Sequence, residues 1–450
     1  MSRYVAPELA ALWLADFVLA FIVAHLLMAA SPAARDALGA SWQALADARL
    51  ADHAALLASM LGMTAIAIGL YRPDICLEPR QVALNAAVVA VIAFPVALAL
   101  GGAVSPGLTR AYAAQVLGVL AVWVGSVLLI RWAVRAALSP ALLVRRVLLV
   151  GASESSSRLV ATLRTRRGAM FEVAGAIEAA GTPPSLEELR RSRVWALVAT
   201  GGCDPDASGW MLDYKLRGVE VFDELAFCER HLGRISLERL SVAWLLGADG
   251  FGSGRFGAAT KRATDIVVSL VMLALMLPLM ALTALAVRLD SPGPAFYRQE
   301  RVGLHGRGIT LLKFRSMRVD AEAGGTPRWA ARGDTRVTRI GAFIRSTRID
   351  ELPQLLNVLR GDMSLVGPRP ERPHFVEQLS ELIPFYRQRS YVKPGLTGWA
   401  QVNYPYGASV EDAREKLAYD LYYIKNQGFF LDLLVLLATV RVILFREGAR

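Results

Sequence analysis

Long apolar runs alternate with short charged segments over the first third of the chain. Four runs approach the roughly 20 residues that cross a bilayer as a helix, at about residues 9–30, 54–71, 83–104 and 112–130. The first run is too long for the apolar part of a cleavable signal peptide, so a retained helix is expected. The pattern predicts a four-helix transmembrane bundle over residues 1–140. Asp16 either marks a polar path through this bundle or faces its interior, and the interior position is favoured.

Arginines indicate how the bundle is oriented. The loop over residues 31–53 carries no excess of positive charge, whereas arginines lie between the second and third runs and after the fourth: Arg72, Arg80, Arg131, Arg135, Arg145 and Arg146. Cytoplasmic loops are enriched in Lys and Arg. Both ends of the bundle are therefore expected on the cytoplasmic side of the membrane.

Short apolar strands and helical patterns alternate after the bundle. Residues 147–152 have the pattern of a strand that enters a glycine turn, and further strands are expected at 173–177, 195–199 and 219–222. This alternation predicts a small, parallel, Rossmann-like α/β domain over residues 141–250.

Two segments of this domain resemble known ligand-binding motifs but are not expected to bind a ligand. Ser153 and Ser156 stand where the dinucleotide motif G-x-G-x-x-G has glycines, which hinders close approach of a pyrophosphate to the backbone. A regulatory or assembly role is therefore favoured over nucleotide binding. Asp204 and Asp206 have the spacing of a metal-binding acidic pair but lie in a turn-like stretch, and we interpret them as a loop.

A third unit, residues 255–450, opens with an apolar segment at 266–287 that Pro278 interrupts. Proline removes a backbone hydrogen bond and bends or breaks a helix. The segment either crosses the membrane as a kinked helix or forms a re-entrant helix over about 264–288. Cations at both ends (Lys261, Arg262 and Arg288) favour re-entry. The apolar stretch at 429–445 is expected to lie along the membrane interface.

Two adjacent acids, Asp350 and Glu351, precede a short helical pattern. Leucines recur on one face of this helix, with Pro353 in its first turn and Gly361 just past its end. The positive end of the helix dipole favours the ionised form of acids at this place. Such acids are often simple caps, so the pair is either a cap or a catalytic pair.

Basic residues surround these acids in the sequence. Lys313 follows an apparent strand, Arg369 lies between two prolines, and four arginines precede the acids: Arg336, Arg339, Arg345 and Arg348. The arginine fork matches phosphate oxygens, although some of these side chains are expected only to form a solvated or lipid-facing surface. Carboxylates among cations fit a magnesium ion and a pyrophosphate-linked substrate, and a carboxylate can also attack phosphorus.

The composition of the chain favours some classes of binding partner over others. Hydrophobic residues make up 54% of the chain and the net charge is +11, which fits a membrane protein that binds anionic lipid or phosphorylated substrates. Binding to nucleic acid is not expected, because the arginines are scattered and flank apolar runs. The three cysteines are too far apart for a disulfide framework or a zinc site.

Several motifs in chain order give the last 190 or so residues a close resemblance to the bacterial sugar transferase family. The matching segments are 291–294, 297–303, 313–317, 350–354, 361–364, 367–371 and 393–399. The whole chain resembles the large form of the monotopic polyprenyl-phosphate glycosyl-1-phosphate transferases. The tract at 402–412 resembles the subset associated with exosortase systems.

The resemblance implies a re-entrant-helix monotopic catalytic domain that completes an α plus α/β membrane protein. It implies that Asp350 attacks the sugar-bearing phosphate of a UDP-sugar and expels UMP, and that undecaprenyl phosphate then takes the phospho-sugar. Glu351 is implied to help bind Mg²⁺. The implied substrate-binding residues are Lys313, Arg315, Arg369 and Asp420.

The implied role is the first membrane step of exopolysaccharide synthesis, on the cytoplasmic face. A non-catalytic membrane scaffold is the alternative, and a homodimer is a further expectation. One departure concerns the helix break: many relatives have Ser-Pro there, and this chain has Leu277-Pro278. The bend is expected to survive on the proline alone.

Overall fold

The computed structural model of the protein describes residues 7–29, 43–71, 79–104, 110–137, 144–151, 154–165, 171–178, 181–201, 205–252, 254–319, 321, 334–405, 407 and 409–444. Two compact units are present, Met1–His231 and Leu232–Arg450. Residues 232–250 therefore pack with the second unit, whereas the sequence placed them with the α/β domain. Two hydrogen bonds show this packing: the backbone N–H of Ile235 donates to the carbonyl oxygen of Ala418, and Trp399 Nε1 donates to that of Gly233.

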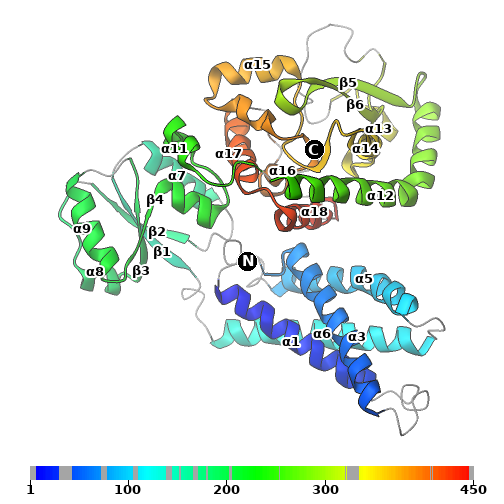
Figure 1. Ribbon diagram of the computed structural model, residues 1–450, viewed down its shortest axis with the longest axis horizontal. Coiled ribbons are helices and arrows are strands. Elements are labelled where there is room, and N and C mark those ends of the chain that lie inside the picture. The colour runs from blue at the N-terminus through cyan, green and yellow to red at the C-terminus, as the bar shows by residue number, and fades with distance from the viewer. Residues whose placement is uncertain are drawn as a thin grey trace. The chain divides into compact units, whose positions relative to one another are not determined.

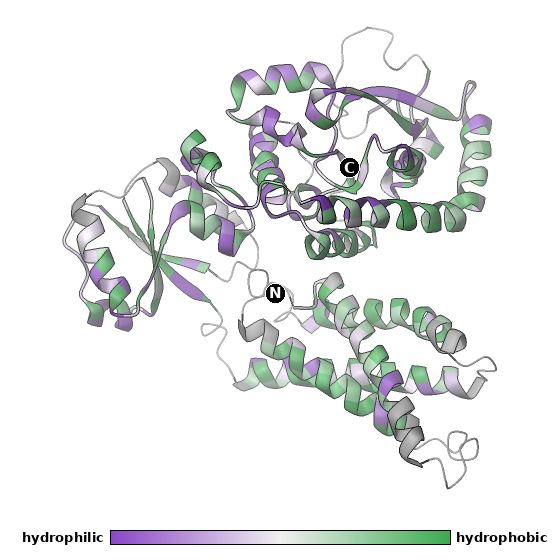
Figure 2. Ribbon diagram, in the orientation of Figure 1, coloured by the Kyte–Doolittle hydropathy of each residue, from purple (hydrophilic) through white to green (hydrophobic). Residues whose placement is uncertain are grey.

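Four helices pack together at the start of the first unit (Figure 1): α1 (Pro7–Ala29), α3 (Gln43–Ile68), α5 (Pro79–Val104) and α6 (Arg110–Ala137). Helices α1 and α5 each contact both α3 and α6. Hydrophobic residues predominate along all four helices (Figure 2). Helix α3 includes residues 43–53, which the sequence analysis had placed in a loop.

Two of these four helices are long and apolar enough to cross a membrane. Their apolar windows are Pro79–Ala99 in α5 and Tyr112–Ala136 in α6. Within the described residues, the apolar windows of α1 and α3 are shorter, at Ala11–Leu27 and Ala51–Ile66. The protein is therefore a membrane protein.

Asp16 faces the interior of the helix group, as favoured from the sequence. Its Oδ2 accepts hydrogen bonds from Tyr71 Oη at 2.9 Å and from Arg131 Nη2 at 2.8 Å. Asp16 and Arg131 are both almost completely buried. This ion pair links α1 to α6, so Arg131, which the sequence analysis counted among the arginines after the fourth run, lies within the helix and is buried.

A parallel four-stranded sheet forms the rest of the first unit, in the order β2-β1-β3-β4. Its strands are β1 (Arg145–Val150), β2 (Phe171–Ile177), β3 (Val194–Ala199) and β4 (Glu220–Asp223). The helices are α7 (Glu154–Thr165), α8 (Leu186–Arg191), α9 (Pro205–Leu216) and α10 (Glu224–Phe227), followed by a π-helical turn at Cys228–Leu232.

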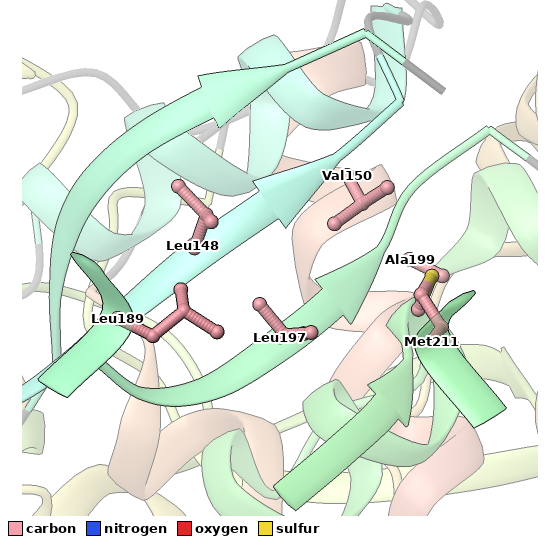
Figure 3. Packing of buried hydrophobic residues seen from close by; sticks show 6 residues of the cluster. All are labelled: Leu148, Val150, Leu189, Leu197, Ala199 and Met211. Atoms are coloured by element: carbon pink, nitrogen blue, oxygen red, sulfur yellow. The ribbon is translucent and has the colours of Figure 1, made fainter. Parts of the chain in front are cut away.

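Alternate residues of β1 and β3 build one side of the core of this sheet. Leu148, Val150, Leu197 and Ala199 point to the same face, where Leu189 of α8 and Met211 of α9 cover them (Figure 3). The strand and helix alternation of the sequence thus produced a parallel sheet, as expected.

The turn after β1 packs tightly against the end of β3. Gly151 has a positive φ of 104°, and a Cβ there would lie 2.1 Å from the carbonyl oxygen of Thr200. The Thr200 hydroxyl also donates a hydrogen bond to the Gly151 carbonyl. Ser153 and Asp204 lie outside the described residues, Ser156 lies in α7, and Asp206 lies in α9 rather than in a loop.

A hairpin and a small parallel sheet form the strands of the second unit. The antiparallel hairpin is β5 (Phe296–Val302) with β6 (Gly308–Phe314), and β7 (Ser364–Val366) pairs with β8 (Gly395–Thr397). The shorter helices are α11 (Val242–Gly247), α13 (Arg339–Ser346), α14 (Leu355–Arg360), α15 (Pro373–Leu382), α16 (Trp399–Asn403), α17 (Val410–Asn426) and α18 (Phe429–Leu444). Short 3₁₀ helices lie at Leu237–Arg239, Leu304–Gly306, Ile349–Gln354 and Tyr386–Tyr391.

The apolar helix α12 (Arg255–Asp290) is continuous through Pro278 and changes direction along its length (Figure 1). It is also long and apolar enough to cross a membrane. We attribute the bend to Pro278, which cannot donate the backbone hydrogen bond of its turn. Residues from both sides of Pro278 pack against one cluster around Phe314 and Ile344: Leu273 and Met276 before it, and Met280, Ala284 and Val287 after it.

Three charged side chains tie the first turns of α12 to later elements. Lys261 Nζ donates to the Val366 carbonyl of β7 at 3.0 Å and to a carboxylate oxygen of Asp432 in α18 at 2.7 Å. Arg262 donates to two carbonyls at the end of α14. The carboxylate of Asp265 accepts from the backbone N–H and side-chain hydroxyl of two β7 residues, both at 3.0 Å. The start of α12 is thereby fixed to the same domain that its later half contacts.

Aromatic rings enclose His231 at the end of the first unit. The rings of Phe171, Trp195, Phe222 and Phe227 all lie with centroids 5.1 to 5.4 Å from the imidazole. Burial among these rings, together with the positive charges of Arg230 and Arg145, lowers the pKa of His231 to about 4.

We predict that His231 makes the α/β domain less stable as the pH falls. Between pH 6.5 and about 4 the unfolded chain protonates this histidine and the folded chain does not, so each pH unit removes about 1.4 kcal/mol. Hydrogen exchange of the sheet amides in the full chain, corrected for intrinsic rates, measures the effect. His231→Phe should remove this part of the pH dependence. An unchanged slope in that variant would contradict the prediction.

Candidate active site

The acidic pair lies at the start of a short helix, as the sequence predicted, but in a tighter form. Asp350 and Glu351 belong to the 3₁₀ helix Ile349–Gln354, which leads directly into α14. Arg348 precedes this helix with a left-handed backbone, φ 60° and ψ 11°. Both acids are buried, so they are not exposed caps.

Glu351 gathers cations from three separate segments. Lys313 Nζ of β6 lies 3.0 Å from Glu351 Oε1, and Arg369 Nη2 donates to the same oxygen. Arg348 Nη1 is 3.7 Å from it, an ion pair beyond hydrogen-bond distance. The structure therefore brings together four of the residues that the sequence or the family resemblance singled out for the site: Lys313, Asp350, Glu351 and Arg369.

The two carboxyl groups have opposite electrostatic environments. Burial alone would raise the pKa of Glu351, but Arg369, Lys313 and Arg348 hold it well below its ordinary value. Burial and the negative charge of Glu351 raise the pKa of Asp350 to about 6. Burial also lowers the pKa of the Lys313 ammonium group, an effect that Glu351 opposes. The raised pKa of Asp350 is opposite to the expected helix-dipole effect, whereas the lowered pKa of Glu351 has the expected direction and is caused by the neighbouring cations.

Asp350 has an oxygen atom available for chemistry. Its Oδ1 is buried and has no hydrogen-bond partner within the described part of the chain. A buried carboxylate oxygen of this kind is costly unless something pairs with it. The Asp350 carboxyl also interacts electrostatically with Glu351 and with the cations Lys313, Arg348 and Arg369.

Asn357, which the sequence analysis did not single out, fixes the strand that carries Lys313. Its side chain is fully buried in α14. Nδ2 donates to the carbonyl oxygen of Thr310 at 2.7 Å, and Oδ1 accepts from the backbone N–H of Leu312 at 3.1 Å. These two bonds attach β6 to the helix that follows the acidic pair. A polar residue within the leucine pattern of α14 was the signal in the sequence.

Hydrogen bonds to the backbone on both sides of Arg369 hold its loop in place. The N–H of Gly367 donates to the Thr397 carbonyl, and Arg389 Nη2 donates to the carbonyl of Arg369 itself at 3.0 Å. Arg301 Nη1 donates to the Pro370 carbonyl at 3.1 Å. The two flanking prolines therefore belong to a loop whose position is fixed by β8 and by two further arginines.

Arg315, assigned to substrate binding from the family resemblance, has a different position in the structure. Its buried guanidinium donates to the carbonyls of Val287, Ser291 and Pro292 at 3.3, 2.6 and 2.8 Å. It thus satisfies carbonyl groups at the C-terminal end of α12. Gly293 beside it has a φ of 120°, which favours glycine, and a Cβ there would lie 2.1 Å from Arg315 Nη1.

Asp420 is connected to the Arg369 loop through Arg389 and makes no direct contact with the acidic pair among the ion pairs of the described residues. It is buried in α17 and forms an ion pair with Arg389 at 2.9 Å. Burial raises the pKa of Asp420 to about 6, although Arg389 opposes this. Because Arg389 also donates to the Arg369 carbonyl and to Tyr386 Oη, Asp420 contacts the residue that positions Arg369.

A cavity of about 280 Å³ lies on the other face of the hairpin. It is lined by Arg298, Thr310, Leu312 and Arg360. Side chains alternate along a strand, so Leu312 points away from the face to which Lys313 contributes. This cavity is not the site of the acidic pair.

Comparison with known proteins identifies the family. A family model described as "Bacterial sugar transferase" matches residues 256–446. The chain is 49% identical over 193 residues to the UDP-N-acetylgalactosamine-undecaprenyl-phosphate N-acetylgalactosaminephosphotransferase of Aeromonas hydrophila, covering 43% of this chain and 45% of that protein. It is 35% identical over 321 residues to the undecaprenyl-phosphate glucose phosphotransferase of Komagataeibacter xylinus, covering 68% and 60%.

A third relative is matched over most of its length. The UDP-glucose:undecaprenyl-phosphate glucose-1-phosphate transferase of Caulobacter vibrioides (strain ATCC 19089 / CIP 103742 / CB 15) is 47% identical over 191 residues, 42% of this chain and 71% of that protein. The chain spans less than two thirds of the Aeromonas and Komagataeibacter proteins. The structure thus combines a bent apolar helix with a buried site of two acids and three cations. The chain belongs to the bacterial sugar transferase family.

We predict that Arg315→Met destabilises the domain without weakening donor binding. The change removes the hydrogen bonds that the charged Arg315 guanidinium donates to the carbonyls of Ser291 and Pro292, and a bond of this kind contributes about 1.5–3 kcal/mol. The thermal midpoint of the full chain in nanodiscs should fall, while KM for the sugar donor stays within about twofold. Arg318→Met, at an exposed position three residues later, is the matched control. A raised KM with an unchanged midpoint would restore the substrate-binding assignment.

Proposed function

We propose that the protein transfers a sugar-1-phosphate from a UDP-sugar to undecaprenyl phosphate, giving undecaprenyl-diphosphate-sugar and UMP. One observation carries the proposal: within the described residues, an oxygen of buried Asp350 has no hydrogen-bond partner, and three cations hold the pKa of the adjacent Glu351 low. A carboxylate among cations suits attack on a phosphate that already carries negative charge. The names of the relatives, which describe transfer of glucose phosphate or N-acetylgalactosamine phosphate, support the same reaction class.

The reaction has two balanced steps. An oxygen of Asp350 forms a bond to the sugar-bearing phosphorus, and the bond from that phosphorus to the bridging oxygen breaks, so UMP leaves with this oxygen. A phosphate oxygen of undecaprenyl phosphate then attacks the same phosphorus and forms the diphosphate. The bond to Asp350 breaks, and its carboxylate is regenerated.

Mg²⁺ is part of the proposal. The described residues contain no group of three or more His, Cys, Asp or Glu side chains placed to hold a metal. Mg²⁺, however, is often bound by one or two carboxylates together with substrate phosphates, and Glu351 beside the unpartnered oxygen of Asp350 fits that need. Glu351 would hold the ion as the donor phosphates engage its cations. The bound ion would neutralise charge on the diphosphate.

The geometry of α12 supports a re-entrant arrangement on one side of the membrane. Lys261 and Asp265 attach its start to β7, and Arg315 attaches its end to β6. A straight spanning helix would place these two attachments on opposite sides of the bilayer. Exposed apolar side chains along α12 and on α18 provide a surface for lipid. We place the domain on the cytoplasmic face of the inner membrane, where UDP-sugars and the phosphate of the carrier meet.

The proposal also covers the pathway and the sugar donor. We assign the reaction to the first membrane step of exopolysaccharide synthesis. The relatives are named for different sugars, glucose and N-acetylgalactosamine, so the donor has to be found by testing a panel. A homodimer stays a prediction.

We predict that Asp350→Asn abolishes turnover. The amide is a poor nucleophile, so UMP release from the preferred UDP-sugar should fall by about 10³-fold or more. The assay uses the full chain in nanodiscs with undecaprenyl phosphate and Mg²⁺. Asp249→Asn, at an exposed position, should retain full activity. A phospho-sugar adduct on the Asp350 peptide of the wild-type protein, detected by mass spectrometry, should be absent from the Asp350 variant.

Other outcomes separate the alternatives. Release of UDP in place of UMP would mean direct glycosyl transfer and discard the aspartyl intermediate. Full turnover of Asp350→Asn would move the nucleophile elsewhere. Failure of every donor in the panel would leave the scaffold interpretation in place.

A further inference from the structure

Arg348 occupies a backbone conformation that its own side chain makes unfavourable. Its φ of 60° and ψ of 11° lie in the left-handed region, which residues with a Cβ rarely adopt and glycine or asparagine adopt readily. The residue stands two positions before Asp350, at the entry to the 3₁₀ helix. Strain at such a place points to a function for the side chain, because glycine would serve the backbone better.

The guanidinium of Arg348 is the least committed cation of the site. Lys313 and Arg369 hydrogen-bond to Glu351, whereas Arg348 approaches it only as an ion pair at 3.7 Å. The Arg348 side chain is 33% exposed, compared with 18% for Lys313 and 29% for Arg369. About a third of the Arg348 side chain is thus accessible, and its planar fork of N–H donors, which forms no hydrogen bond to Glu351, can receive a phosphate.

The charge of the site favours an additional anion. Three cations surround two carboxyl groups, and Arg348 acts electrostatically on both acids. Glu351 Oε1 is shared by Lys313, Arg348 and Arg369. One carboxylate cannot satisfy all the donors of these three side chains, so Arg348, which pairs with Glu351 without a hydrogen bond, is available to the substrate.

We propose that Arg348 binds the phosphate of the leaving nucleotide and stabilises it as the bond to the sugar-bearing phosphorus breaks. This inference rests on the proposed function. The sugar-bearing phosphorus must lie against Asp350, next to the deeper cations on Glu351. The nucleotide has to depart into water, so its phosphate belongs on the exposed side, where Arg348 is the available donor.

The variant Arg348→Gly removes the side chain and keeps the backbone conformation, so it tests the function of the side chain alone. Glycine accepts a φ of 60° without strain, so the thermal midpoint should stay the same or rise. Inhibition by added UMP should weaken by about tenfold or more, which corresponds to about 1.4 kcal/mol of lost binding. UMP release in a single turnover should slow to a similar or greater extent. Discharge of the preformed phospho-sugar intermediate by undecaprenyl phosphate should change by less than about threefold, because UMP has already left.

Two further variants complete the test. Arg348→Lys keeps the charge but loses the fork, and should fall between wild type and Arg348→Gly in UMP inhibition. Arg339→Gln changes an exposed arginine at the start of α13 and should match wild type in every measurement. An unchanged UMP inhibition constant in Arg348→Gly, or equal slowing of both half-reactions, overturns the assignment. Failure of the wild-type protein to release UMP would instead overturn the proposed function, so the two failures are distinguishable.

Discussion

A single buried negative charge organises the catalytic unit. The carboxylate of Glu351 is almost completely buried, and burying a charge is costly unless it is paired. Its partners come from three places in the chain: Lys313 from β6, Arg348 from the residue before the 3₁₀ helix, and Arg369 from a proline-bounded loop. The same charge raises the pKa of neighbouring Asp350. One electrostatic requirement thus assembles the cations and keeps the two acids chemically different.

The bent helix α12 is attached to this site at both of its ends. Arg262 and Asp265 near its start bind the end of α14 and β7, which border the acidic pair and the Arg369 loop. Arg315, two residues beyond Lys313, binds its end. A shift of α12 in the bilayer would therefore be transmitted to both sides of the acidic pair. The bend at Pro278 allows both attachments to belong to one domain.

Local patterns predicted much of the site. The leucine spacing after Asp350 indicated a helix with the acids at its start, and the prolines around Arg369 indicated a rigidly held arginine; both features are present. The assignment of Arg315 to substrate binding came from its place in the motif that contains Lys313, but the structure directs its guanidinium to the end of α12. Asn357 and Arg389 escaped notice because their partners, Thr310 and Asp420, are distant in sequence.

The sequence by itself determined the elements whose signals are local. Apolar runs set the long helices, the alternation of strands and helices set the parallel sheet, and Pro278 set the bend, because each depends on neighbouring residues and on water or lipid as solvent. The tertiary structure decided which charges meet. Asp16 pairs with Arg131, and Glu351 binds three cations, through contacts between segments far apart in the chain. Burial at those contacts, together with the charge of Glu351, then raised the pKa of Asp350, since desolvation depends on the whole surrounding fold.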